Sequence, residues 1–197
     1  MSSRFRRVRG GAITVTLEPV EAAVLANLIG QIIILLKDGD DQRDVPSEPA
    51  DDPLAAALGP GFGFGSGLDE GTVQPPEDEV LARLLPDGYR GDPDAAAEFR
   101  RFTESDLRAH KIAAATTVLS TLGSGGKITL DAEQAEAWLL LLNDLRLAIG
   151  TRLSITEDYE SAAASLAEGD PQLPMYELYE WLTWLQDSLV RVLTGAL

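Results

Sequence analysis

Cysteine is absent from this chain of 197 residues, and histidine occurs once, as His110. Without thiols the protein can form no disulfide, no zinc–thiolate site and no cysteine-based redox sensor. One histidine also excludes a multi-histidine metal site within one chain. Hydrophobic residues make up 45% of the sequence, so the chain is expected to fold around a core.

Positive charge is also scarce, because 16 Lys and Arg residues face 32 Asp and Glu residues and leave a net charge of −16. Such a total repels phosphate backbones and disfavours DNA as a partner. Charges beyond about 8 Å are screened, however, so a local basic cluster still attracts phosphate. The nucleic-acid candidates are Arg4, Arg6, Arg7 and Arg9, followed by Arg100, Arg101, Arg108 and Lys111. The alternative is that these residues neutralise the protein's own carboxylates.

Long hydrophobic runs are few. The best membrane candidate, Val24 to Leu36, contains Asn27, Gly30 and Gln31 and is too short to span about 30 Å of hydrocarbon. No secretory signal follows the N-terminal arginines, since the next run alternates and stops at Glu18-Pro19. We therefore expect a cytoplasmic protein without a membrane contact.

Phosphate-binding and catalytic motifs fail on inspection. The run Gly123 to Lys127 has Thr121 where a phosphate-binding loop needs glycine, and Ile128 where it needs Ser or Thr. A strand is expected after it in place of a helix, so the run predicts a plain turn. Ser66 and Ser124 lack the upstream glycine of a nucleophile elbow.

The acidic run at Asp38, Asp40 and Asp41 also fails as a calcium loop, because Arg43 and Pro49 occupy the glycine and glutamate positions. We predict no metal site, no cofactor, no catalytic residue and no enzymatic activity. An acidic-residue metal hydrolase is the least favoured class.

Two passages resemble each other closely. Val15–Ala22 and Ile128–Ala135 each place a β-branched pair and a leucine before an acidic residue that can cap a helix. Gln134 lies three residues after Asp131, as a capping box requires. The pattern predicts strands at 13–16 and 128–130 that pair with each other, each followed by an apolar helix. The first helix is expected over 19–37, and the second to end at Gly150.

The remaining pattern predicts a mainly α fold, a compact helical domain with the two short strands as a small ribbon. Further helices are expected at 76–85, 93–101, 104–122 and 174–193, with Thr103 and Asp106 capping the third of these. Residues 38–75 are acidic and rich in Pro and Gly, which predicts a long disordered insertion. We therefore divide the chain into residues 1–37, the insertion 38–75, and residues 76–197 of the same domain.

Polar and aromatic residues mark two further features. Asn143, Asp144 and Arg146 interrupt the most apolar helix, and Arg146 and Arg152 are expected to pair with Asp144, Glu157 or Asp158 as packing anchors. The helix at 19–37 and the segment 174–193 together offer more apolar surface than one small domain covers, which predicts a homodimer with the C-terminal helix in or beside the interface. The interface candidates are Tyr176, Tyr179, Trp181, Trp184 and Leu185.

A family resemblance joins several of these segments. They are Leu84–Tyr89, Ala95–Arg101, Asp106–Arg108, Ala137–Leu139, Leu142–Ala148, Gly150–Leu153 and Trp181–Gln186, with Tyr176, Tyr179 and Leu189-Val190. On these residues the chain resembles an actinobacterial family of domains of unknown function that includes the actinomycete oxidative-stress regulator. The resemblance implies a redox-linked regulator, and genes of the family lie near a ClpS-type proteolytic adaptor.

The thiol-dependent sensing of that family cannot apply to a chain without cysteine. We therefore expect a non-enzymatic cytoplasmic regulatory protein in transcription, related to the oxidative-stress response but without cysteine-based sensing. The alternative is a protein–protein interaction adaptor in Clp-type proteolysis that makes no DNA contact. In both cases the expected partner is a protein, of the transcription or the proteolysis machinery.

Overall fold

The computed structural model describes residues 3–8, 10–41, 75–89, 91–156, 159, 163, 165–167 and 169–195. Its helices are α1 (Pro19–Asp41), α3 (Glu79–Leu84), α4 (Pro93–Leu122), α5 (Ala132–Arg152) and α7 (Leu173–Thr194). Its strands are β1 (Arg6–Arg7), β2 (Ile13–Leu17) and β3 (Gly126–Leu130). The mainly α prediction is confirmed. The predicted disordered insertion falls almost wholly on residues 42–74, which lie outside the described ranges.

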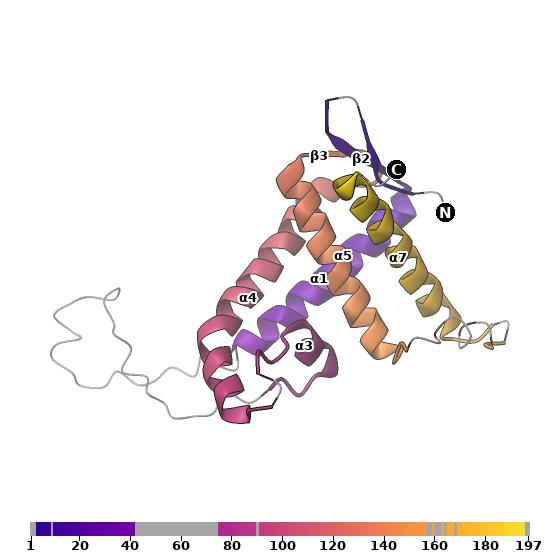
Figure 1. Cartoon of the computed structure of the whole chain (residues 1–197). Helices are drawn as coiled ribbons and strands as arrows, with labels where there is room; N and C mark the ends of the chain where they lie inside the picture. Colours follow the sequence, from indigo (N-terminus) through magenta and orange to yellow (C-terminus); the bar gives the residue numbers. More distant parts are fainter. Residues whose placement is uncertain are drawn as a thin grey trace.

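The three strands form an antiparallel sheet in the order β1-β2-β3. The predicted pairing of the two longer strands is confirmed, with Val15 opposite Ile128 and Ile13 opposite Leu130. The sequence did not indicate β1, because two arginines carry no strand periodicity. Figure 1 shows the sheet at one end of the molecule, with the long helices diverging from it and both termini beside it.

Both strand–helix passages begin their helices in a similar way. Gln134 Oε1 accepts the Asp131 N–H at 3.0 Å while Asp131 accepts the Gln134 N–H at 2.8 Å, so the predicted capping box is present. In the other passage Glu21 Oε2 accepts the Glu18 N–H at 2.8 Å. The same oxygen accepts the hydroxyl of Ser3 at 2.6 Å, which satisfies the buried carboxylate.

The turn before β3 depends on one close contact. A Cβ on Gly125 would lie 3.0 Å from both Cα and N of Pro19, and its φ is +100°. Only glycine fits this position without strain. Residues 123–125 form the turn that the sequence predicted, Gly126 and Lys127 already belong to β3, and the turn lies against the start of α1.

α4 is one helix of 30 residues, so the predicted break near residue 103 is wrong. The Thr103 hydroxyl donates to the Phe99 carbonyl at 2.8 Å inside the helix and caps nothing. The predicted first cap is confirmed, since the Asp92 side chain accepts the Ala95 N–H at 3.0 Å, and Gly123 ends the helix as expected. Local cap signals gave the wrong boundary because side chains on the buried face of α4 join its two halves.

α5 continues through Gly150 to Arg152, so the predicted end of this helix is wrong. Gly150 serves packing instead, because a Cβ there would lie 3.3 Å from the Tyr179 ring of α7. The absence of a side chain lets the two helices approach closely at this turn.

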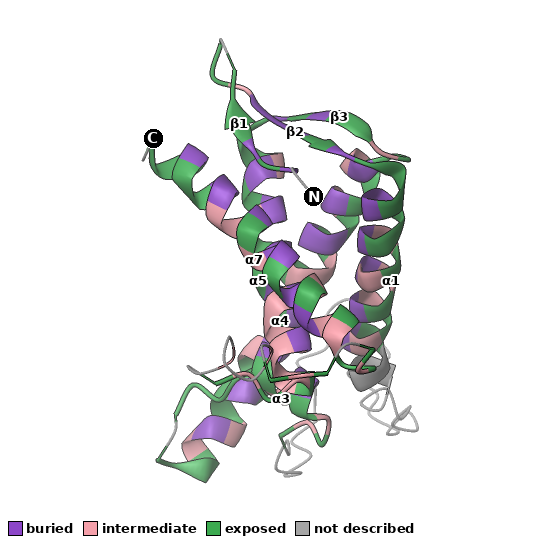
Figure 2. Cartoon of the chain, turned by 90° about the vertical axis from the view of Figure 1, so that its right-hand side faces the viewer, coloured by how far each residue is buried: buried purple, intermediate pink, exposed green. Residues whose placement is uncertain are grey.

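The core surrounds α5, which contacts α3, α4 and α7. Its Trp138 is fully buried, packs edge-on against Phe5 at 5.6 Å between ring centroids, and donates from Nε1 to the Thr121 hydroxyl at 2.9 Å. α1 lies at the periphery and packs on α4 with one face (Figure 2). The long helices therefore differ in how many neighbours they have.

α1 also passes a length and composition test for a membrane span over Pro19–Lys37, with 19 residues and a mean hydropathy of 1.9. Among the described residues it is the one helix that does so. The expectation that the run is too short was made for Val24 to Leu36 alone, whereas the test is passed by the longer stretch Pro19–Lys37. About a third of the stretch, 33%, is buried inside the molecule, and core helices of water-soluble proteins pass the same test.

Candidate interaction surface

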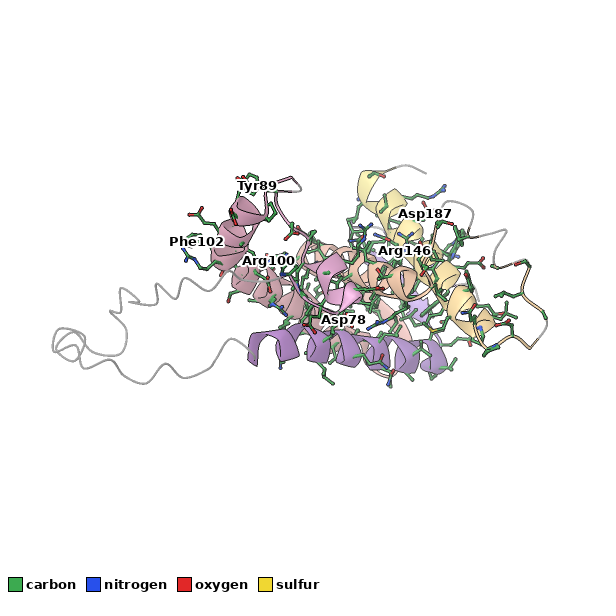
Figure 3. The ribbon with its side chains drawn as sticks, turned by 90° about the horizontal axis from the view of Figure 1, so that it is seen from below. Asp78, Tyr89, Arg100, Phe102, Arg146 and Asp187 are labelled. Carbon is green, nitrogen blue, oxygen red and sulfur yellow. The ribbon has the colours of Figure 1, made fainter. Side chains whose placement is uncertain are left out.

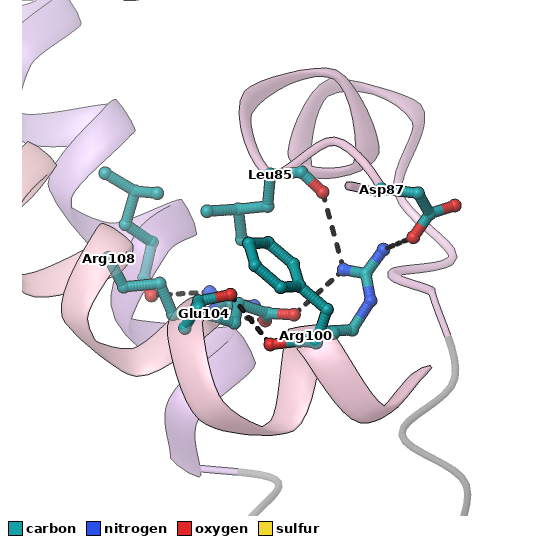
Figure 4. Close-up of polar contacts among 8 residues, drawn as sticks. Leu85, Asp87, Arg100, Glu104 and Arg108 are labelled. Carbon is teal, nitrogen blue, oxygen red and sulfur yellow. Dashed lines mark hydrogen bonds and ion pairs between the residues drawn. The ribbon is translucent and has the colours of Figure 1, made fainter. Parts of the chain in front are cut away.

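The N-terminal half of α4 is held in place by a buried ladder of charges, Arg100, Glu104 and Arg108, spaced four residues apart (Figure 4). Glu104 Oε2 accepts from Arg100 at 2.8 Å, and Glu104 Oε1 accepts from Nε and Nη2 of Arg108 at 2.9 and 2.7 Å. All three side chains are buried. This spacing aligns them on one face of the helix, and each arginine has a carboxylate partner.

The outer contacts of the ladder connect three elements. Arg108 Nη1 donates to the carbonyl of Leu36 in α1 at 2.8 Å. Arg100 donates to the carbonyl of Leu85 after α3 at 3.4 Å and forms an ion pair with Asp87. Burial alone would lower the pKa of Arg100, but its hydrogen bonds to Glu104 and Asp87 outweigh burial and raise that pKa. Arg100 therefore stays charged, and the ladder fixes α4 to α1 and to the segment before it.

The opposite face of the same turns is aromatic and exposed. Tyr89, Phe99 and Phe102 are all exposed, and the guanidinium of Arg101 lies 4.9 Å from the Phe102 ring centroid. We call these four residues the aromatic tip. Figure 3 shows Tyr89 and Phe102 at the end of α4 that points away from the other helices, with Arg100 directed inward.

The tip is ordered by one tight approach. The rings of Tyr89 and Phe99 meet edge-on at 5.8 Å between centroids. A Cβ on Gly88 would lie 2.7 Å from the Phe99 ring, so glycine is needed for this approach. Sequence reasoning missed the tip. The signal was available in Phe99 and Phe102, which are three residues apart and lie off the face of Arg100 and Glu104.

A second ion pair joins α4 to α5. Lys111 Nζ lies 2.7 Å from Asp144 Oδ1, and both side chains are largely buried. Burial raises the pKa of Asp144, and the hydrogen bond and charge of Lys111 oppose that rise, with a smaller contribution from His110. Asp144 therefore pairs with Lys111, and the expected pairing with Arg146 or Arg152 is wrong.

Arg146 faces α7 and binds polar side chains there. It donates to the Thr183 hydroxyl at 2.9 Å and to Gln186 Oε1 at 2.5 Å, and its guanidinium lies 5.3 Å from the Tyr179 ring centroid. Arg152 pairs with Asp78 at 2.6 Å. The backbone N–H of Leu81 is the main cause that lowers the pKa of Asp78, burial opposes it, and Arg152 adds to the lowering. Glu157 and Asp158 lie outside the described residues.

The nucleic-acid candidates fall into two groups. Arg4, Arg6 and Arg7 are exposed on and before β1, and Arg7 donates to the Val192 carbonyl at 2.9 Å. Arg9 lies outside the described residues, and Arg101 is exposed in the aromatic tip. The other three, Arg100, Arg108 and Lys111, pair with the protein's own carboxylates, which is the alternative that the sequence left open.

The interface candidates on α7 differ in their exposure to solvent. Tyr176, Tyr179, Trp181 and Leu185 are buried in the monomer. Trp184 is 49% exposed, and of these five residues it offers the most surface to a partner. Homodimer formation therefore stays a prediction, and the apolar residues of α7 exposed for it are Trp184, Val190 and Leu193.

Within the described residues no group of three or more His, Asp and Glu side chains is placed to hold a metal ion. The polar clusters of this part of the chain instead form ion pairs between helices. The open surface with the most aromatic character is the aromatic tip, whose chemistry is that of a contact with another macromolecule.

Known proteins match the chain over almost its whole length. Residues 2–193 match the model of a family described as a domain of unknown function, DUF2017. The oxidative stress regulator AosR of Mycobacterium tuberculosis (strain ATCC 25618 / H37Rv) is 35% identical over 210 residues, covering 98% of this chain and 88% of that protein. The putative oxidative stress regulator AosR of Mycobacterium leprae is 32% identical over 204 residues, covering 96% and 86%. No solved structure matches.

Proposed function

Because the chain belongs to the DUF2017 family, we propose that it is a non-enzymatic cytoplasmic regulatory protein of transcription, related to the response to oxidative stress. The observation that carries this proposal is the similarity to proteins named oxidative stress regulators, which extends over 98% of the chain at 35% identity. The contacts on which regulation depends are made with macromolecules.

The input of this regulator is not the oxidation of its own thiols, since the chain has no cysteine. Two methionines are the remaining sulfur-containing residues, and Met175 is partly buried against the core. The signal therefore reaches the protein through a partner or a bound molecule. Treating the purified protein with hydrogen peroxide should leave its partner binding unchanged, and a peroxide-dependent loss of binding would contradict this part of the proposal.

Binding to duplex DNA tests the transcriptional role. Replacing Arg4, Arg6, Arg7 and Arg9 with alanine should weaken binding and flatten the dependence of log K on log salt by up to about 3.6 units, because each phosphate contact contributes about 0.9. Fluorescence anisotropy with a labelled duplex from 50 to 200 mM salt measures both quantities. Lys127→Ala, an exposed basic change on β3, is the matched control and should leave the slope unchanged. No binding at low salt would remove DNA from the proposal.

The second candidate function is the protein interaction adaptor, and the aromatic tip favours it. An exposed tyrosine, two phenylalanines and an arginine are residue types that dominate protein interfaces. Phe102→Ala should then lower recovery of a specific partner in a pull-down from the native cytoplasm, with nucleic acid retained. Leu119→Ala, at an exposed apolar position of the same helix, is the control. Equal partner recovery by wild type and Phe102→Ala would argue against the tip.

A further inference from the structure

The outer face of α1 has a coiled-coil spacing. Seven residues of α1 are exposed from Val20 to Lys37, and five of them, Val20, Val24, Asn27, Gln31 and Ile34, are separated by four, three, four and three residues; the other two are Ala23 and Lys37. These intervals are those of a and d positions in a heptad repeat. We call these five residues the α1 seam. They lie on the side of α1 opposite its buried residues, and α1 itself runs along the outer edge of the molecule in Figure 2.

The residues beside the seam fit a helix partner. Leu28 and Leu35 border one side and are only partly buried by the core. Ala23 and Gly30 border the other side, and a Cβ on Gly30 would meet nothing within 4 Å. Large apolar residues on one side form a ridge, and small residues on the other side leave a groove, so a second helix can pack against this face.

Charge distinguishes this face from the rest of the surface. No charged residue occurs from Ala22 to Leu36, in a chain whose net charge is −16. Two copies of such a chain repel each other, so self-association requires a surface from which carboxylates are excluded. The outer face of α1 meets that requirement, and a polar pair at its centre, where Gln31 donates to Asn27 at 2.6 Å, is suited to pair with itself across a two-fold axis.

We infer that the α1 seam binds the same seam of a second copy, with the two helices antiparallel. The antiparallel order places Asn27 opposite Gln31 and Val24 opposite Ile34 of the other copy, so polar meets polar and apolar meets apolar. A parallel order would align the dipoles of the two helices side by side, which disfavours that order.

Sedimentation equilibrium on the full chain tests the inference. Val24→Glu should raise the dimer dissociation constant at least about 100-fold, because a two-fold interface would bury the new carboxylate twice without a partner. The fold should survive, since Val24 is 37% exposed. Leu140→Glu is the matched control, because Leu140 on the outer face of α5 is also 37% exposed. It should leave the dimer intact.

The absence of cysteine allows a direct test of orientation. Val24→Cys and Ile34→Cys are made in separate chains, mixed and mildly oxidised. A disulfide between the two different variants is expected in the mixture and none in either variant alone. Disulfides within Val24→Cys alone would show a parallel pair and overturn the antiparallel arrangement.

Three other results would overturn the inference. The first is a wild-type chain that remains monomeric at 100 µM or above. The second is a dimer that Val24→Glu leaves intact but Trp184→Glu dissociates, which would assign the interface to α7. The third is a monomer that sediments with phosphatidylcholine and phosphatidylglycerol vesicles and loses this binding in Val24→Glu, because the seam would then contact lipid.

Discussion

The two strand–helix passages of this protein have similar sequences and similar local structure, yet their helices have different surroundings. β2 and β3 pair with each other. Before each helix, a side chain of the first turn accepts a backbone N–H from three residues earlier: Glu21 accepts that of Glu18, and Gln134 accepts that of Asp131. α5 then runs between α3, α4 and α7, whereas α1 packs mainly on α4 and leaves a long face open. Similar strand–helix sequences therefore lead to a central helix in one case and a peripheral helix in the other.

The exposed residues of the two helices differ in an informative way. The outer face of α5 includes Glu133 and Glu136, as expected for a helix surface that meets only water. The outer face of α1 has valine, isoleucine, asparagine and glutamine and no charge over four turns. This difference is what the inferred self-association through the α1 seam would explain.

The C-terminal part of α1 is anchored by the Arg108 contact with the Leu36 carbonyl, and Glu104 holds that arginine. Glu104→Gln leaves two buried arginines without their shared carboxylate. We expect a loss of about 3–5 kcal/mol in the free energy of unfolding, measured by urea denaturation. Arg101→Ala, the exposed neighbour, should change stability by less than about 0.5 kcal/mol. A similar loss in both variants would show that the ladder is not what holds α4.

Truncation of one apolar side chain on each helix measures the difference in packing directly. Leu142→Ala on α5 removes a fully buried side chain and should cost about 2–5 kcal/mol. Ile34→Ala on α1 removes a side chain that is 59% exposed and should cost less than about 1 kcal/mol in the dilute monomer. Both are measured by urea denaturation below 1 µM. Equal losses would show that the outer face of α1 is covered within the monomer.

The caps differ by one hydrogen bond. Asp131 accepts the Gln134 N–H, whereas Glu18 has no corresponding side-chain bond among those of the described structure. Asp131→Ala should cost about 1 kcal/mol and Glu18→Ala much less. Thermal unfolding of both variants at one protein concentration gives the comparison. A larger loss for Glu18→Ala would reverse it.

α1 has a glycine near its middle and α5 has one near its end, and substitution by alanine should change the free energy of unfolding differently at the two sites. Gly30→Ala on α1 meets open space and should stabilise the dilute monomer by about 0.5–1 kcal/mol. Gly150→Ala on α5 forces the Tyr179 ring 3.3 Å away to move, which offsets that gain. Denaturant midpoints measure both changes, and an equal gain at both sites would contradict the close packing of α5 on α7.

Acidification should change the stability contributions of Asp144 and Asp78 in opposite directions, because their pKa values are shifted in opposite directions. Because the pKa of Asp144 is raised on folding, the folded state holds its proton more tightly and acidification favours it. The stability of wild type relative to Asp144→Asn should therefore rise as the pH falls from neutrality through the folded pKa of Asp144 to the unfolded value near 3.9. The pKa of Asp78 is lowered, so wild type relative to Asp78→Asn should lose stability as the pH falls below about 3.9. The same trend for both would contradict these assignments.

Much of the fold followed from sequence because its signals are local. Asp131 and Gln134 are three residues apart, so one turn of helix brings them together whatever surrounds it. The alternation of Ile13 to Leu17 likewise defines a strand, and its partner is the other such run in the chain. Gly123 ended a helix as expected because glycine accepts the backbone conformation needed there.

The remaining features depended on contacts between segments far apart in sequence. The cap signal at Thr103 was overridden because Glu104 joins Arg100 to Arg108, and Arg108 reaches Leu36, 72 residues away. Gly150 did not end α5, since α7 supplies the Tyr179 ring that occupies the missing side chain's place. Lys111 and not Arg146 met Asp144, because the crossing of α4 and α5 decides which cation is near.

By itself the sequence determined the two longer strands, the starts of α1, α4 and α5, the absence of thiol chemistry and the neutral character of α1, because these depend on composition and on neighbours within four residues. Only the tertiary structure decided which charges are buried and that the aromatic tip is exposed. It also decided that α1 lies at the edge of the molecule, whereas α5, which follows a similar strand–helix sequence, lies at the centre. Burial is a property of all the segments that pack around a residue, and a helix's own sequence cannot specify where those segments lie.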